Sequence, residues 1–126
     1  QLHGQDLESL KIPLFTEVYE IDGPYFFGIA NKFDDISRRT QSGEQKVRII
    51  RMRKVSFIDS TGIHNLEQLH LRLQRDGIQL VLSGVNDKVF SALDKAGLVN
   101  KIGRENVRNH INGALARAAE IVKLGD

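Results

Sequence analysis

The chain has 126 residues, of which 40% are hydrophobic and 27% are charged, as expected for one folded domain with a modest core. The absence of cysteine excludes disulfides and thiolate metal sites, and a formal net charge of +2 is too small to indicate nucleic acid as a partner. No run approaches the roughly eighteen apolar residues that a membrane-spanning helix needs, and no secretory signal pattern is present. Because the chain begins with Gln1 and not with Met, we expect it to be a piece of a longer protein.

The first residues carry no sustained hydrophobic period, so we expect a linker or frayed arm over 1–10 and one domain over 11–126. The stretch from Leu14 to Ile21 is typical of a strand. Turn residues follow at 22–24, and 25–29 is apolar on both faces, which predicts a second, buried strand that forms a hairpin with the first.

A short helix capped by Asn31 and a third strand from Lys46 to Met52 are predicted next. Basic residues are concentrated in and just after this strand, at Arg48, Arg51, Arg53 and Lys54. We interpret this basic cluster as a solvated edge of the sheet. The alternative is a docking surface for an acidic partner or for anionic headgroups.

The hydrophobic period changes from that of a strand to that of a helix near residue 59. Downstream of this point, apolar residues recur at spacings of three and four, at Ile63, Leu66, Leu69 and Leu73. The pattern predicts a helix from about Ser60 to Arg75. Asp76 and Gly77 are expected to end it, since glycine is favoured just past a helix.

The residues at the start of this helix form the candidate site: Asp59, Ser60, Thr61 and Gly62. The side-chain oxygen of Asp59 or Ser60 can cap the helix by accepting a bond from a free backbone N–H group, which is the commonest role of these residues. A helix N-terminus also carries a partial positive charge that favours an anion. The alternative is that Ser60 is a switch hydroxyl, which is modified or contacts a ligand.

Strands and helices alternate in the second half of the chain. Residues 78–82 predict a fourth strand, and the turn at 83–87 offers an Asn or Asp as the cap of the next helix. A last helix is predicted from Glu105 or Asn106, with an apolar stripe of Val107, Ile111, Leu115, Ala118 and Val122. This order predicts an α/β domain with a mostly parallel sheet. The turns at 59–62 and 83–87 should then lie at the same end of the sheet, at the carboxyl ends of the strands, where sites form.

Enzymatic chemistry is not predicted. The sequence has no glycine-rich phosphate loop with its lysine, no paired carboxylates on one face, and no nucleophile with a histidine and a third group in order. His64 and His70 share no face with a nearby carboxylate at metal-ligand spacing, so neither a metal nor another cofactor is expected. We therefore predict that the chain is not an enzyme and has no catalytic residues.

Three stretches resemble one known family. The loop Phe57–Gly62, following a strand, resembles the signature loop of the STAS domain (sulfate transporter and anti-sigma-factor antagonist). The stretch Val18–Gly28 is similar to the opening hairpin of STAS domains at the C-terminal end of SulP-type anion transporters, and the tail from Glu105 to Ala118 resembles the last helix of the family. The likeness covers about residues 14–122.

The resemblance implies a STAS-like fold, with a mixed, mostly parallel sheet of about four to five strands and about four to five helices. It implies a non-catalytic regulatory and interaction domain of a SulP-type secondary transporter of sulfate, bicarbonate or a similar anion, at the cytoplasmic face of the inner cell membrane. The partners that it implies are the transmembrane domain of the same transporter, a twin subunit in a full-length homodimer, and a cytosolic regulatory protein. Weak nucleotide binding stays open.

In the antagonist branch of the family, the serine directly after the aspartate is phosphorylated, and Ser60 holds that place. The resemblance therefore implies that Ser60 is a phosphorylation or switch site within a partner-binding loop of Asp59, Ser60, Thr61 and Gly62. It also supports an alternative function, an anti-sigma-factor-antagonist-like partner-switching protein that is regulated by phosphorylation of Ser60. The run of glycine, proline and aromatic residues at 23–27 favours the transporter branch.

Overall fold

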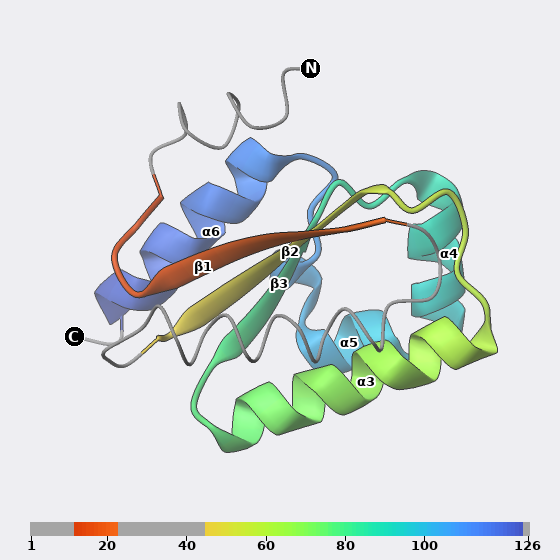
Figure 1. The fold of residues 1–126 in the computed structure, drawn as a ribbon, viewed down its shortest axis with the longest axis horizontal. Helices are drawn as coiled ribbons and strands as arrows, with labels where there is room; N and C mark the ends of the chain where they lie inside the picture. The colour runs from red at the N-terminus through yellow and green to blue at the C-terminus, as the bar shows by residue number, and fades with distance from the viewer. Residues whose placement is uncertain (1–11, 23–44, 125–126) are drawn as a thin grey trace.

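A computed structural model gives the fold and describes residues 12–22 and 45–124. Three parallel strands form the sheet of these residues, and β2 lies between β1 and β3 (Figure 1). The strands are β1 (Thr16–Asp22), β2 (Val47–Lys54) and β3 (Gln79–Ser83). Because the strands are parallel, their carboxyl ends lie at the same edge of the sheet.

Helices cover both faces of this sheet (Figure 1). The helix α6 (Ile111–Leu124) packs on one face, and the other face is covered by α3 (Ser60–Arg75), α4 (Asp87–Lys95) and the short α5 (Leu98–Ile102). A 3-10 turn, η1 (Arg104–Asn106), follows α5. Among the described residues, no helix has both the length and the apolar character that a bilayer crossing requires.

The alternation of side chains along β2 explains why both faces are covered. Val47 and Ile49 point toward α6 and pack with residues such as Ala114. Ile50 and Met52 point to the opposite face, where they pack with leucines of α3 and α4. Each of these four β2 side chains is at most 1% exposed, as expected for a strand inside a parallel sheet.

The predicted α/β fold with a mostly parallel sheet is confirmed. The helix predicted from Ser60 to Arg75 has those bounds, and Gly77 follows it with a positive φ of 78°. Three strands and four α-helices lie within the described part of the chain, in agreement with the predicted architecture. The strand predicted at 25–29, the helix capped by Asn31 and the arm at 1–10 lie outside the described residues.

The interpretation of the basic cluster as a solvated edge is wrong for its first two members. Arg48 and Arg51 are only 4% and 5% exposed, because β2 is flanked by a strand on each side. The Arg48 Nε atom donates to Oε1 of Glu17 at 2.9 Å, and Arg53 pairs with Glu20 further along the same two strands. Glu17 and Glu20 of β1 therefore form ion pairs with Arg48 and Arg53 of β2. This pairing argues against an open basic docking surface here.

The last helix begins later than predicted. It starts at Ile111, because the residues before it are used by the sheet. Val107 has extended backbone angles and forms a parallel bridge with Leu82, and Arg108 N donates to the Leu82 carbonyl at 2.8 Å. Residues committed to β3 in this way cannot also form a helical turn. Val107 is nevertheless buried, as its apolar side chain predicts, but it lies before α6 and not within it.

Candidate functional site

The candidate site begins where β2 ends. Val55 and Ile58 are buried in the core, whereas Ser56 is exposed and the side chain of Phe57 is 44% exposed. The Val55 backbone N–H donates to the Met52 carbonyl at 3.0 Å and so turns the chain away from the strand. The loop therefore alternates between core contacts and solvent as it approaches α3.

Asp59 caps helix α3. Its backbone is extended, and its side-chain Oδ1 atom accepts a hydrogen bond from the Gly62 backbone N–H at 3.0 Å. The Asp59 carbonyl also accepts from Ile63 N at 2.9 Å, as an N-cap residue does. Of the two caps that the sequence offered, Asp59 or Ser60, the structure uses Asp59.

Ser60 and Thr61 are exposed at the first turn of α3, while Gly62 is buried. Within the described part of the chain, the Ser60 hydroxyl makes no hydrogen bond, because Asp59 has taken the capping role. A hydroxyl in this place is open to solvent and lies at the partially positive end of a helix of 16 residues. Its assignment as a switch stays a prediction.

A second loop, after β3, lies against the first one. The side-chain Nδ2 atom of Asn86 donates to the carbonyls of Val55 at 3.2 Å and of Ser56 at 3.4 Å. The prediction that the turns after the two strands lie at the same end of the sheet is thus confirmed, and the two loops are in direct contact there. The sequence offered Asn86 or Asp87 as the cap of α4, and the structure uses Asn86. The contact of Asn86 with the other loop was missed, since no local pattern reports a contact across 31 residues.

An ion pair lies at the same end of β1 and β2. The Nε and Nη2 atoms of Arg53 are 2.7 Å and 3.1 Å from Oε2 and Oε1 of Glu20. Lys54 Nζ is 3.9 Å from Glu20 Oε2. The hydrogen bonds from Arg53 hold the pKa of the Glu20 carboxyl below its ordinary value of 4.5. Glu20 is therefore ionised at neutral pH and offsets the basic residues of β2.

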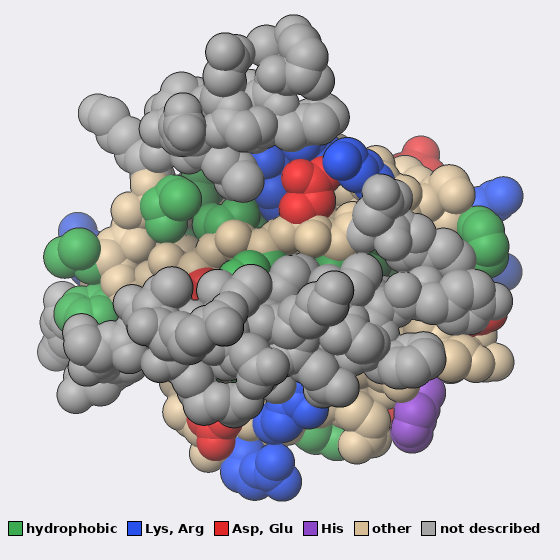
Figure 2. Space-filling model, viewed as in Figure 1, with side chains coloured by type: hydrophobic (Ala, Val, Ile, Leu, Met, Phe, Trp, Pro, Cys, Tyr) green, Lys and Arg blue, Asp and Glu red, His purple; other side chains and the backbone are tan. Residues whose placement is uncertain are grey.

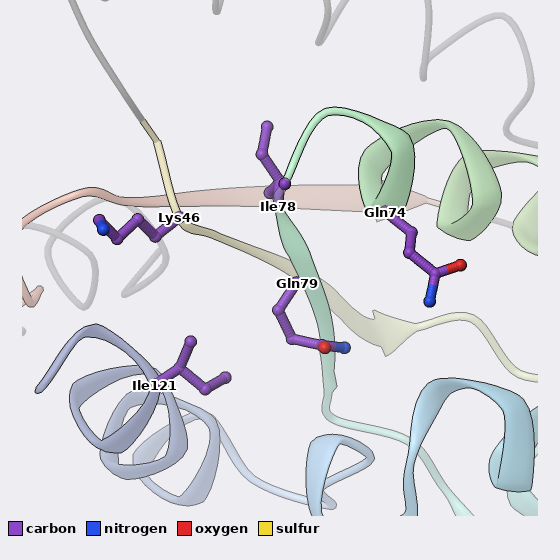
Figure 3. A pocket seen from close by; sticks show the side chains of 6 residues that line it. Lys46, Gln74, Ile78, Gln79 and Ile121 are labelled. Atoms are coloured by element: carbon purple, nitrogen blue, oxygen red, sulfur yellow. The ribbon is translucent and has the colours of Figure 1, made fainter. Parts of the chain in front are cut away.

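A hollow of about 340 Å³ lies at the opposite end of the sheet, where β2 and β3 begin (Figure 3). Figure 3 shows the side chains around it, which come from the residues directly before β2 and β3, from the first residue of β3, and from the C-terminal parts of α3 and α6: Lys46, Ile78, Gln79, Gln74 and Ile121. One cation and two amides give it little means of fixing a ligand. Because sites in parallel sheets form beyond the carboxyl ends of the strands, we do not place the functional site here.

The described residues contain no group of three or more His, Asp or Glu side chains that could hold a metal ion. His70, which is 5% exposed, packs on the inner side of α3, and this burial lowers the pKa of its imidazole. The site at the carboxyl ends of the strands thus offers an exposed hydroxyl and backbone groups, which suit recognition of another molecule.

Figure 2 shows acidic and basic side chains mixed on one face of the protein, with hydrophobic side chains on the side where β1 begins. The exposed hydrophobic residues before β1 are Ile12, Leu14 and Phe15, with exposures of 41%, 76% and 41%. Among the described residues on this face, basic and acidic side chains are both visible and are not separated into two surfaces.

The parallel sheet, the two helical layers and the capped loop before α3 define the class of protein. The chain belongs to the STAS domain family, which its sequence matches over residues 11–114.

Solved structures of bacterial relatives are similar over almost the whole chain. A sulfate transporter family protein from Wolinella succinogenes is 39% identical, with a TM-score of 0.79, and the match covers 92% of this chain and 94% of that one. The STAS domain of a SulP transporter from Vibrio cholerae is 30% identical, with a TM-score of 0.78 and coverage of 98% and 96%.

Among curated proteins, Sulfate transporter 1.2 of Arabidopsis thaliana is 31% identical over 111 residues, which cover 79% of this chain and 17% of that protein. The chain therefore spans about a sixth of the length of a relative of this kind.

Proposed function

We propose that this chain is the non-catalytic regulatory domain of a SulP-type secondary anion transporter, at the cytoplasmic face of the membrane. Two relatives carry the words sulfate transporter or SulP transporter in their names, and one of them is a STAS domain studied as a separate unit. The share of 17% that the chain covers in a curated relative leaves room for a membrane part. Sulfate, bicarbonate or a similar anion would be carried by that part.

The observation that carries the proposal is that Ser60 is exposed and that the neighbouring residue, Asp59, caps α3 without the Ser60 hydroxyl. Asp59 fixes the start of α3 through its bond to Gly62 N, so the Ser60 hydroxyl can be modified or contacted without unfolding the helix. We propose the loop Asp59–Gly62 as the surface that docks on the membrane part of the same protein. A twin subunit and a cytosolic regulatory protein are the further partners.

A phosphate on Ser60 would add about −2 charge at neutral pH, directly beside the Asp59 carboxylate. Charge of this size changes an interface without a change of fold, which suits a regulatory hydroxyl. The same step would operate in a free-standing partner-switching protein. We do not favour that alternative, because the similar proteins named above are transporters.

Photo-crosslinking in the full-length protein tests the proposal. A photoreactive phenylalanine analogue at position 60 should crosslink to the membrane part upon irradiation. The same analogue at Ser91, which is exposed on α4 and further along the chain, is the matched control and should crosslink much less. Equal yields from the two positions, or no crosslink from position 60, would contradict the docking role of the loop.

A further inference from the structure

We propose that Asn86 is the positioning residue of the docking surface: it joins the Ser60 loop to helix α4, so that a partner meets the two loops as one unit. The inference deepens the proposed function and rests on it, since it concerns how the proposed docking loop is held. It extends the proposed docking loop, Asp59–Gly62, by residues 56–58 directly before it and by residues 86–88 at the start of α4. The name Ser60 loop is used for residues 56–62.

Both polar atoms of the Asn86 side chain form hydrogen bonds. Its Oδ1 atom accepts from Val89 N at 2.7 Å and caps α4, while its Nδ2 atom donates to the carbonyls of Val55 and Ser56 at 3.2 and 3.4 Å. An asparagine amide has one acceptor oxygen and two N–H donors, so one side chain can serve all three backbone groups. An aspartate cap cannot do this, because a carboxylate has no donor, and a serine or threonine cap has a single O–H donor for the two carbonyls.

The two carbonyls mark the point where the Ser60 loop leaves the core. Val55 is fully buried, whereas Ser56 is exposed. Since β2 ends at Lys54, these carbonyls lie beyond the strand pairing that would otherwise hold them. Asn86 therefore sets the path by which the chain emerges from the core toward Ser60.

A second contact holds the second loop against strand β2 just before Asn86. Gly84 has a φ of 69°, and a Cβ atom added to it would lie 2.8 Å from the backbone nitrogen of Arg53. Only glycine permits this approach, so the backbones at the ends of β2 and β3 are in direct contact. Gly84 thus holds the second loop against the end of β2, and Asn86, two residues further on, joins that loop to Val55 and Ser56.

The joined loops present a mixed surface. The first loop exposes Ser56, Phe57, Ser60 and Thr61, and the second exposes Asn86, Asp87 and Lys88. Phe57, at 44% exposure, supplies an apolar centre among polar side chains, which is the arrangement of a typical protein-binding surface. A partner seated on Phe57 and Ser60 would therefore respond to the position of α4.

Distance measurements between spin labels test the joint directly, because the chain has no cysteine of its own. Labels at Ser56→Cys and Lys88→Cys, two exposed positions, report the separation of the loops. Asn86→Asp keeps a good helix cap but loses the donor, so we expect the distance distribution to broaden roughly twofold, while the melting temperature stays near that of the parent. Asn100→Asp, the same change at an exposed position of α5, should leave the distribution unchanged. An unchanged width in Asn86→Asp would overturn the joint.

Binding of the chain to the separately produced membrane part then tests its consequence. We expect Asn86→Asp to weaken binding about tenfold, because a loop that is no longer held in place must be ordered when the partner binds, and to add little to the effect of Ser60→Asp. Fully additive effects of the two changes would overturn the single-surface model. If the unaltered chain does not bind at all, the proposed function fails, and the spin-label result alone decides whether Asn86 joins the loops.

Discussion

Glu17 of β1 and Arg48 of β2 are direct neighbours in the parallel register, and 2.9 Å separates Arg48 Nε from Glu17 Oε1. Both residues are more than nine-tenths buried. The Arg48 guanidinium also lies 5.5 Å from the centre of the Tyr19 ring. A charged pair in this position stabilises the fold only while both partners are present, since removal of one leaves a buried charge.

Arg48→Ala should therefore lower the free energy of unfolding by about 3 to 5 kcal/mol, as measured by urea denaturation. Arg75→Ala, which removes the same side chain from an exposed position on α3, is the control and should change it by less than about 0.5 kcal/mol. Similar, small losses in both variants would show that the Glu17 carboxylate is solvated after all.

Gly84→Ala and Gly77→Ala separate two effects of glycine. Both positions have a positive φ, 69° and 78°, so alanine at either should cost about 1 to 2 kcal/mol of backbone strain. A Cβ atom at Gly77 meets nothing within 4 Å, whereas at Gly84 it lies 2.8 Å from Arg53 N. Denaturation should therefore show a further loss of about 1 to 3 kcal/mol for Gly84→Ala. Equal losses would mean that the backbone at Gly84 is not in close contact with the end of β2.

The stability of the fold should fall as the solution is acidified through the titration range of His70. Burial of His70 on α3 lowers the pKa of its imidazole below the ordinary value of 6.5, and the nearby Glu67 carboxylate only partly opposes this effect. The unfolded chain then takes up the proton first, so this contribution is complete above about pH 6.5 and is lost as the pH drops toward the folded-state pKa.

Urea denaturation between about pH 5 and pH 8 measures this effect. In His70→Leu the slope of stability against pH in this range should become smaller. His64 is an exposed histidine on the same helix, so His64→Leu should retain the slope of stability against pH. A slope that His70→Leu leaves unchanged would assign the effect to other groups.

Features with local causes could be predicted from the sequence. Helix α3 was predicted with its observed bounds, because its apolar spacing, its polar start and Gly77 all lie within one continuous stretch. The exposure of Ser60 follows from the same stretch, since Asp59 can cap the helix and leave the next residue in solvent. The placement of the two strand-end loops at one end of the sheet followed from the parallel order of the strands.

Features with distant causes could not be predicted in this way. The burial of Arg48 depends on Glu17, which lies 31 residues earlier, and the shortened last helix depends on the pairing of Val107 with Leu82. Asn86 has an ordinary local role as a cap, which conceals its contact with Val55. In each case the sequence shows the side chain, but the partner comes from another element of the fold.

The affinity of this chain for the membrane part of its own protein, measured by calorimetric titration with Ser60→Asp and Ser91→Asp, tests the docking role of the loop most directly. Both changes add one negative charge at an exposed serine, and both should leave the melting temperature close to that of the unaltered chain. We predict that Ser60→Asp weakens binding by about tenfold or more, whereas Ser91→Asp leaves it within about twofold. Equal affinities for the two variants and the unaltered chain would contradict the account.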